Sequence, residues 1–259
     1  RTVATIHGLD WQRAKWGRLG SAYIKRGERA AVKSADEMIV LSRSAQDYFE
    51  QTYNRKTVYI PNGVDPKEPR PSDEIRQRWG LEEGSYVLFL GRLVPEKRPD
   101  LLIDAFKSIE TDKHLVIAGG GSDTSEYEQQ LHEQAKGDPR VLFTGFVTGE
   151  LLAELYSNAY CYVLPSDVEG MPMSLLEAMA YGRTCVTSDI PECSDVLAGT
   201  GATFPRGDVS ALRDVLAALL ANPAHAREFE ATAKARVEAE YGWDSVVERT
   251  LEVYKGVSA

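Results

Sequence analysis

The chain lacks the features that mark several large classes of protein. It has only three cysteines, Cys161, Cys185 and Cys193, with no CxxC spacing and no Cys/His cluster, so the sequence offers no metal-binding pattern. No apolar run approaches the roughly 18 residues of a membrane span, and no signal peptide is visible. This sparse and odd set of cysteines fits a reducing compartment, and the cytoplasm is therefore the expected location.

Basic residues are outnumbered by acidic ones. The chain has 30 basic and 39 acidic residues, a net charge of −9, which argues against nonspecific binding to nucleic acid. Residues 11–33 are the exception, with seven Lys or Arg against Glu28 alone. At helical spacing, one side of this segment carries basic residues and another carries Trp16, Leu19 and Tyr23. The basic residues on that side are Lys15, Arg18, Lys25, Arg29 and Lys33. Such a helix suits peripheral contact with an anionic membrane, at its inner face, and a plain amphipathic surface helix explains the pattern equally well.

What the chain does have is a regular alternation of short apolar runs and amphipathic segments, in a composition ordinary for a globular protein (43% hydrophobic, 27% charged). The runs predict strands at 3–6, 38–41, 58–60, 87–90, 115–118, 141–143, 161–164, 184–187 and 202–204. Helices are predicted at 16–34, 43–53, 72–79, 98–109, 124–136, 149–157, 171–181, 192–197, 208–221, 224–240 and 243–255. Strands buried on both faces and joined by helices indicate an α/β protein with doubly wound parallel sheets.

The stretch Ser166 to Glu177 holds two carboxylates, Glu169 and Glu177, around the start of a predicted helix. That helix follows a buried strand, and ligands of open α/β sheets bind at the carboxyl ends of strands. Helix-start amides attract anions, while carboxylates accept hydrogen bonds from hydroxyls. A site with both suits a sugar or ribose that carries phosphate.

Several motifs accompany this pair in a fixed order across residues 57–190. They are Tyr59-Ile-Pro-Asn-Gly-Val-Asp65, Phe89-Leu-Gly-Arg-Leu-Val-Pro-Glu-Lys-Arg98, Ile117-Ala-Gly-Gly-Gly-Ser122, Val141-Leu-Phe-Thr-Gly-Phe-Val147 and the E-x7-E pair. The ordered set resembles the retaining GT-B glycosyltransferases of family 4, also called group 1. The resemblance implies a GT-B fold, with one near-complete Rossmann-like domain and the tail of a second.

The resemblance also implies a division of the chain. Residues 1–66 correspond to the C-terminal part of the acceptor domain, 67–240 to the donor-nucleotide domain, and 241–259 to a helix that returns toward the first domain. The proline-rich residues 61–72 support a boundary there. Because the first part supplies only three strands and the chain begins with Arg1, we expect an N-terminally truncated domain, with Trp243 poorly packed and the last helix mobile.

By the same resemblance, Arg92 and Lys97 grip the phosphates of the nucleotide and stabilise its departure, and Gly91 lets the backbone approach closely. The alternative is a solvated basic loop in which Lys97 pairs with Glu96 or Asp100.

The two carboxylates have different implied tasks. Glu177 accepts hydrogen bonds from the ribose, while Glu169 faces the donor sugar and steadies positive charge at its anomeric carbon. Backbone amides of Gly170, Met171 and Met173 are expected to bind the donor, since Pro172 has no N–H. Acids that merely decorate a helix N-terminus are the alternative.

Three further positions complete the expected site. Gly120 lies in the loop near the nucleotide, Phe146 and Val147 contact the base, and His7 faces the donor sugar from across the cleft. The alternatives are a flexible turn, a core aromatic at a strand end and a structural histidine. No DxD motif is evident, so neither a metal nor another cofactor is expected.

The function implied is transfer of a hexose or deoxyhexose from a nucleotide-diphosphate sugar to a saccharide, free or lipid-linked, with retention of anomeric configuration. A nucleotide-sugar epimerase or phosphorylase of the same fold, and a non-catalytic nucleotide-binding module, are the alternatives. The nucleotide base, the sugar, the acceptor and the linkage stay open.

Overall fold

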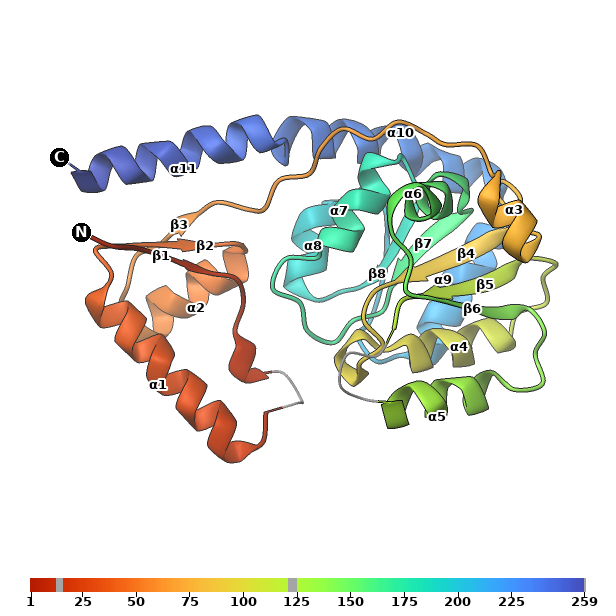
Figure 1. Cartoon of the computed structure of the whole chain (residues 1–259), viewed down its shortest axis with the longest axis horizontal. Helices are drawn as coiled ribbons and strands as arrows, with labels where there is room; N and C mark the ends of the chain where they lie inside the picture. The colour runs from red at the N-terminus through yellow and green to blue at the C-terminus, as the bar shows by residue number, and fades with distance from the viewer. Residues whose placement is uncertain (13–15, 121–124, 259) are drawn as a thin grey trace.

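The computed structural model describes residues 1–12, 16–120 and 125–258. In these ranges the chain forms two parallel β-sheets, ordered β1-β2-β3 and β6-β5-β4-β7-β8-β9, each with helices packed on it (Figure 1). The strands are β1 (Val3–Ile6), β2 (Glu37–Val40), β3 (Val58–Tyr59), β4 (Tyr86–Leu90), β5 (His114–Ala118), β6 (Val141–Gly145), β7 (Cys161–Leu164), β8 (Cys185–Ser188) and β9 (Ala202–Phe204). The predicted α/β class with parallel sheets is confirmed.

The smaller sheet is covered on both faces. Helices α1 (Arg18–Ser34) and α2 (Arg43–Tyr53) lie on one face, where Met38 and Val40 pack against Phe49. The other face carries Ile39 and Ile60. Helix α2 begins where the Ser42 hydroxyl accepts a hydrogen bond from the Ala45 amide and ends at Asn54 in the left-handed conformation.

The larger sheet is buried on both faces because apolar side chains occupy successive positions along its strands and so point to either face. In β4, Tyr86 and Leu88 pack on one face while Val87 and Phe89 pack on the other. The first face carries α3 (Glu74–Trp79), α6 (Gly149–Asn158), α7 (Met173–Ala180), α8 (Pro191–Leu197) and α10 (Pro223–Glu240). The second carries α4 (Pro99–Lys107), α5 (Ser125–Ala135) and α9 (Val209–Ala221).

The strand order places a switch point between β4 and β7. From β4 the chain proceeds outward through β5 to β6, then returns to the middle of the sheet at β7 and proceeds the other way through β8 to β9. The loops after β4 and β7 therefore diverge at their carboxyl ends and leave a crevice between them. Both predicted phosphate and carboxylate motifs follow these two strands.

The last helix, α11 (Trp243–Ser258), lies on the smaller sheet, where Val246 packs with Ile39 and Ile60 (Figure 1). At its start Trp243 lies over Gly63, so closely that a Cβ added at Gly63 would fall 2.5 Å from the indole. Trp243 thus packs closely against Gly63, although 43% of the residue stays exposed. The sequence did not indicate this contact, because it does not show that the segment after α10 runs beside residues 63–64.

Candidate functional site

The loop after β4 is shaped by close backbone contact with the loop after β5. A Cβ added at Gly119 would lie 1.9 Å from the carbonyl oxygen of Gly91, so only glycine fits at position 119. The Leu93 amide donates to the Gly120 carbonyl at 3.2 Å. At Gly120 itself an added Cβ would meet nothing within 4 Å. These contacts fix the backbone on which Arg92 stands.

Lys97 ends a short 3-10 turn, η2 (Pro95–Lys97), that the sequence did not predict. Arg98 follows in the left-handed conformation, with φ 52°, and Pro99 then begins α4. The Lys97 ammonium lies 2.6 Å from Oε1 of Glu169, with the two side chains only 15% and 7% exposed. The solvated loop with Lys97 paired to Glu96 or Asp100 is therefore not what the structure shows.

Glu169 stands on the loop between β7 and α7 and is held by two neighbours through the same oxygen. Its Oε1 accepts from Lys97 and, at 2.7 Å, from the Ser166 hydroxyl. Among the residues that the structure describes, Oε2 has no hydrogen-bond partner. The carboxylate is thus fixed in orientation while one oxygen stays available to a ligand.

Glu177 is arranged in the same way in the second turn of α7. Its Oε2 accepts from the Tyr156 hydroxyl at 2.9 Å, and Oε1 has no partner within the described ranges. Burial raises the pKa of Tyr156 well above its usual value, so this hydroxyl stays protonated and remains a donor. Tyr156 lies on α6, and no sequence motif pointed to it.

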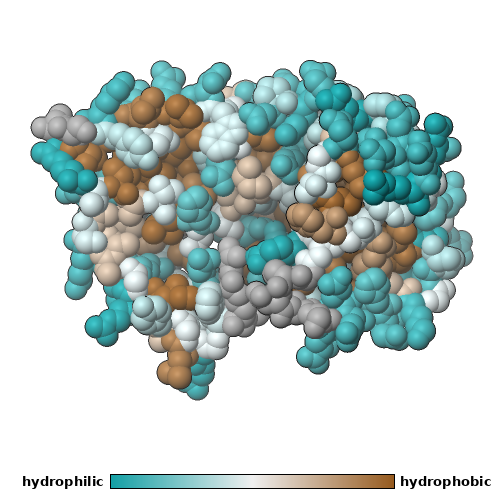
Figure 2. Space-filling view, in the orientation of Figure 1, coloured by the Kyte–Doolittle hydropathy of each residue, from teal (hydrophilic) through white to brown (hydrophobic). Residues whose placement is uncertain are grey.

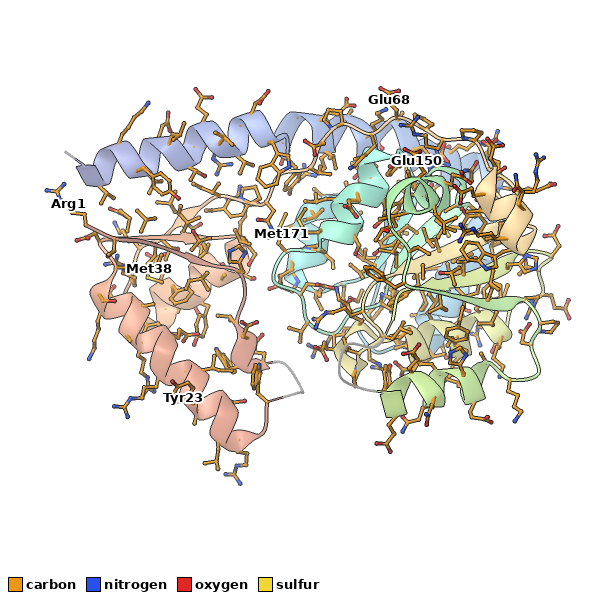
Figure 3. All side chains as sticks on the ribbon, viewed as in Figure 1. Arg1, Tyr23, Met38, Glu68, Glu150 and Met171 are labelled. Atoms are coloured by element: carbon orange, nitrogen blue, oxygen red, sulfur yellow. The ribbon has the colours of Figure 1, made fainter. Side chains whose placement is uncertain are left out.

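A cavity of about 410 Å³, the main cavity, gathers most of the predicted site. The predicted residues that line it are His7, Gly91, Arg92, Lys97, Glu169, Gly170, Met171, Met173 and Glu177. Asn62, Glu96 and Ser174 also line it, and none of the three had a predicted role at the site. All three lie inside the motifs quoted above, and this was the one feature of the sequence that could have indicated a place at the site. Met171 lies on the side of the larger sheet's helices that faces the smaller sheet (Figure 3).

The remaining predicted residues line a second cavity of about 180 Å³, the glycine-loop cavity. Gly120, Phe146 and Val147 line it, and it shares Gly91 and Arg92 with the main cavity. Phe146 is 82% exposed and therefore is not a core aromatic, whereas Val147 is packed in the core. Gly121 and Ser122 of the glycine motif lie outside the described residues.

Loops from the two sheets meet at the main cavity. A Cβ added at Gly170 would lie 2.1 Å from the carbonyl oxygen of His7, which follows β1. The loop after β1 thus rests on the loop before α7. This contact brings His7, from the smaller sheet, to the same cavity as Arg92 and Lys97.

The charged side chains of the main cavity differ in whether they already have a partner of opposite charge. Lys97 and Glu169 neutralise each other, but the exposed guanidinium of Arg92 has no side-chain partner among the described residues. Arg92 is therefore a free cation at the junction of the two cavities. In the described part of the chain no group of three His, Cys, Asp or Glu could hold a metal ion, and metal independence stays a prediction.

None of the helices within the described ranges is long and apolar enough to cross a membrane.

Comparisons with known proteins identify the family of the chain. Residues 71–236 match the family of glycosyl transferases group 1, and residues 1–68 match Glycosyltransferase Family 4. The chain is 29% identical to the alpha-maltose-1-phosphate synthase of Mycolicibacterium smegmatis, over 99% of the chain and 73% of the relative. It is 30% identical to a GDP-mannose-dependent alpha-(1-6)-phosphatidylinositol monomannoside mannosyltransferase of Mycobacterium tuberculosis, over 100% of the chain and 70% of that protein.

Solved structures show the same fold. Sucrose-phosphate synthase from Thermosynechococcus elongatus superposes with a TM-score of 0.84 at 26% identity, over 98% of this chain and 67% of that one. HepE from Anabaena superposes with a TM-score of 0.87 at 20% identity, over 98% and 71% of the two chains. Because the group 1 match spans more than half of the chain, the protein belongs to the glycosyl transferases group 1, with a GT-B fold, and is an enzyme of nucleotide-sugar glycosyl transfer.

Proposed function

We propose that the protein transfers a hexose or deoxyhexose from a nucleoside-diphosphate sugar to a saccharide acceptor, with retention of anomeric configuration. The observation that carries the proposal is the main cavity, in which two cations, Arg92 and Lys97, and two carboxylates, Glu169 and Glu177, line one space. A diphosphate needs cations, and sugar hydroxyls need hydrogen-bond acceptors. The mycobacterial relative named for GDP-mannose supports a hexose donor.

The diphosphate is assigned to Arg92 and Lys97. The Arg92 guanidinium has no side-chain partner within the described ranges and can bind two phosphate oxygens at once. Lys97 follows the same strand, β4, and its ammonium can turn from Glu169 toward the phosphate. The nucleoside extends into the glycine-loop cavity beside Phe146 and Val147, where the exposed ring of Phe146 can pack on a base.

The sugars are assigned to the open carboxylate oxygens. Oε1 of Glu177 accepts from the ribose, and Oε2 of Glu169 lies on the donor-sugar side and stabilises positive charge as the bond to phosphate breaks. His7 orients the donor sugar from the opposite loop. The amides of Gly170, Met171 and Met173 supply further donors, and retention follows the family resemblance.

The test is a donor assay with UDP-, GDP-, ADP- and dTDP-sugars, each with and without saccharide acceptors. We expect acceptor-dependent release of one nucleoside diphosphate and a product whose anomeric protons show retention by NMR. Glu169→Gln should lower turnover by about 100-fold, as loss of a group that stabilises transition-state charge does. Glu68→Gln, exposed on the segment that crosses between the sheets, is the control (Figure 3).

Each other outcome has a meaning. An altered sugar without any acceptor would indicate an epimerase. Inversion of the anomeric centre would refute retention, and an unchanged rate in Glu169→Gln would remove that residue from the reaction.

We propose a second partner, an anionic membrane, at helix α1. Leu19 and Tyr23 are 88% and 79% exposed on a helix that also carries Arg18, Lys25 and Arg29. Figure 2 shows hydrophobic surface at the tip of this helix. Apolar side chains beside cations suit the interface of an anionic bilayer and would bring the enzyme to a lipid-linked acceptor. Arg13 and Lys15 of the basic segment lie outside the described residues.

Sedimentation with vesicles tests this contact. Vesicles with phosphatidylglycerol should retain the protein at low salt, and purely phosphatidylcholine vesicles should not. Replacement of both Leu19 and Tyr23 by Ser should weaken retention by at least about fivefold, since each loses buried apolar area. Equal retention by the two kinds of vesicle would contradict the proposal.

A further inference from the structure

A third cavity, the Arg98 cavity, opens beside the main one and has a volume of about 410 Å³. It is lined by Gln12, Pro95, Glu96, Arg98, Asp100, Tyr127, Asp167 and Val168. Glu96 and Val168 also line the main cavity, so the two spaces adjoin. Gln12, from the short helix η1 (Asp10–Gln12) beside the smaller sheet, forms the opposite wall. A molecule bound there can reach the main cavity past Glu96.

We propose that the Arg98 cavity holds the acceptor and that this acceptor is a neutral, hydroxyl-rich saccharide rather than a sugar phosphate. The inference rests on the proposed function, because an acceptor is needed only if the main cavity holds a donor. Its position follows from the reaction geometry, since the attacking hydroxyl must come within bonding reach of a donor sugar beside Glu169.

The cation of this cavity is not available to a phosphate. Arg98 donates to both oxygens of Asp100, at 3.0–3.2 Å, and to Asp167 at 3.3 Å. Asp100 also accepts from the Tyr127 hydroxyl at 2.7 Å. One guanidinium between two carboxylates leaves a local excess of negative charge, and Glu96 adds to it. Among the residues that the structure describes, a phosphate in this space would face carboxylates and no free cation.

The groups left open suit hydroxyls instead. Within the described ranges neither the Glu96 carboxylate nor the Gln12 side-chain amide has a hydrogen-bond partner. Together they offer acceptors and donors, and the ring of Tyr127 and the side chain of Val168 supply apolar surface for a sugar ring.

Glu96 is the specificity residue of this arrangement. The Asp167 amide donates to the Glu96 carbonyl at 2.8 Å, which ties the η2 turn to the loop that carries Glu169. The Glu96 backbone is thereby fixed where the two cavities adjoin. We assign to the Glu96 carboxylate the acceptor hydroxyl, whose hydrogen bond it would accept and so orient toward the donor.

The experiment measures donor turnover with a panel of neutral mono- and disaccharides and the matching sugar phosphates, while calorimetry follows nucleoside-diphosphate binding to the same variants. We expect neutral saccharides to stimulate turnover more than their phosphates. Glu96→Gln should raise the acceptor KM at least about tenfold, because the hydrogen bond to a carboxylate is replaced by a weaker one to a neutral amide. Its nucleotide Kd should change less than about twofold, and Glu110→Gln, an exposed residue far from both cavities, should change neither.

A second variant tests whether negative charge excludes phosphates from the Arg98 cavity, because it should improve the use of sugar phosphates. Asp167→Asn removes one of the two carboxylates on Arg98 and should lower the KM for sugar phosphates. The inference is overturned if phosphates are preferred by the wild type, if no neutral saccharide stimulates turnover, or if Glu96→Gln leaves the acceptor KM unchanged. Absence of nucleotide binding by the wild type would instead refute the proposed function.

Discussion

Each of the two carboxylates in the main cavity accepts hydrogen bonds from the protein through one oxygen, while its other oxygen has no partner among the described residues. Glu169 is held through Oε1 by Lys97 and Ser166, and Glu177 through Oε2 by Tyr156. Such fixed carboxylates bind hydroxyls with little loss of side-chain entropy, because their rotamers are already set. The pairing of Lys97 with Glu169 also means that a bound phosphate must compete for the ammonium.

The Lys97–Glu169 pair should contribute to folding stability in the absence of ligand. Because both side chains are mostly buried, removal of either partner leaves a charge without compensation. Lys97→Met and Glu169→Gln should each lower the free energy of unfolding by about 2–3 kcal/mol, toward the low end for buried pairs. Urea unfolding of both single variants and the double variant measures the coupling. Strictly additive effects would show that the two side chains do not interact.

Tyr156 should influence nucleotide binding although it stands behind Glu177. Tyr156→Phe keeps the ring but removes the hydroxyl that holds Oε2, so Glu177 gains freedom. We expect nucleotide affinity to fall about three- to tenfold and stability by about 1 kcal/mol. Tyr160→Phe is the matched control, since its hydroxyl donates to the Leu219 carbonyl and Tyr160 does not line the main cavity. An equal effect of both substitutions on nucleotide affinity would refute a specific role.

At the scale of elements, the sequence predicted the strands, the helices and the parallel sheets, but not the order of the strands within each sheet. Every predicted strand is present, because runs of apolar residues bounded by turn signals have few other ways to be buried. The turns η1 and η2 were missed because three residues carry no periodic signal. Helix α7 begins at Met173 rather than 171, with Pro172 just before it.

The site was predictable as a set of motifs and not as a geometry. The order of the motifs indicated which residues gather, and the structure brings most of them to one cavity. The Lys97–Glu169 pair depends on β4 and β7 lying side by side, which requires a strand order that the sequence does not state. Tyr156 was missed because it comes from a helix on one face of the sheet, outside every motif.

The contact between the loops after β1 and before α7 gives a prediction at the scale of elements. In Gly170→Ala the new Cβ would fall 2.1 Å from the His7 carbonyl, and the two loops must separate. We expect turnover to fall at least about tenfold, because a displacement of about 1 Å in an active site has large effects. Gly27→Ala, whose Cβ meets nothing within 4 Å, should leave turnover unchanged. Full activity in Gly170→Ala would mean that the contact is dispensable.

At the scale of the whole molecule, two segments connect the sheets and lie side by side. The Val64 amide donates to the Tyr241 carbonyl at 2.8 Å, and Val64 pairs with Gly242 in a parallel bridge. A third contact joins the helices across the cleft, where the Ser44 hydroxyl donates to Glu192 on α8 at 2.5 Å. We propose the division into residues 1–66, 67–240 and 241–259 with these connections as its boundaries.

The three cysteines report on the integrity of the larger sheet and its helices. All are buried, and burial raises the pKa of Cys161 to about 12 and lifts those of Cys185 and Cys193 above the usual value. The thiolate fraction at pH 8 is therefore negligible in the folded protein. Ellman's reagent should titrate fewer than one thiol in the native state and three in denaturant. Rapid reaction of the native protein would contradict this burial.

The central claim, a nucleoside-diphosphate site built from Arg92, Lys97, Glu169 and Glu177, is tested most directly by calorimetric titration with UDP, GDP, ADP and dTDP. We expect one nucleotide to bind saturably and to lose at least about tenfold in affinity in both Lys97→Ala and Glu177→Ala, as loss of a charged hydrogen bond predicts. Lys136→Ala, at an exposed position directly after α5, should bind as the wild type does. Binding that is absent from the folded wild type, or that survives both substitutions, would contradict the account.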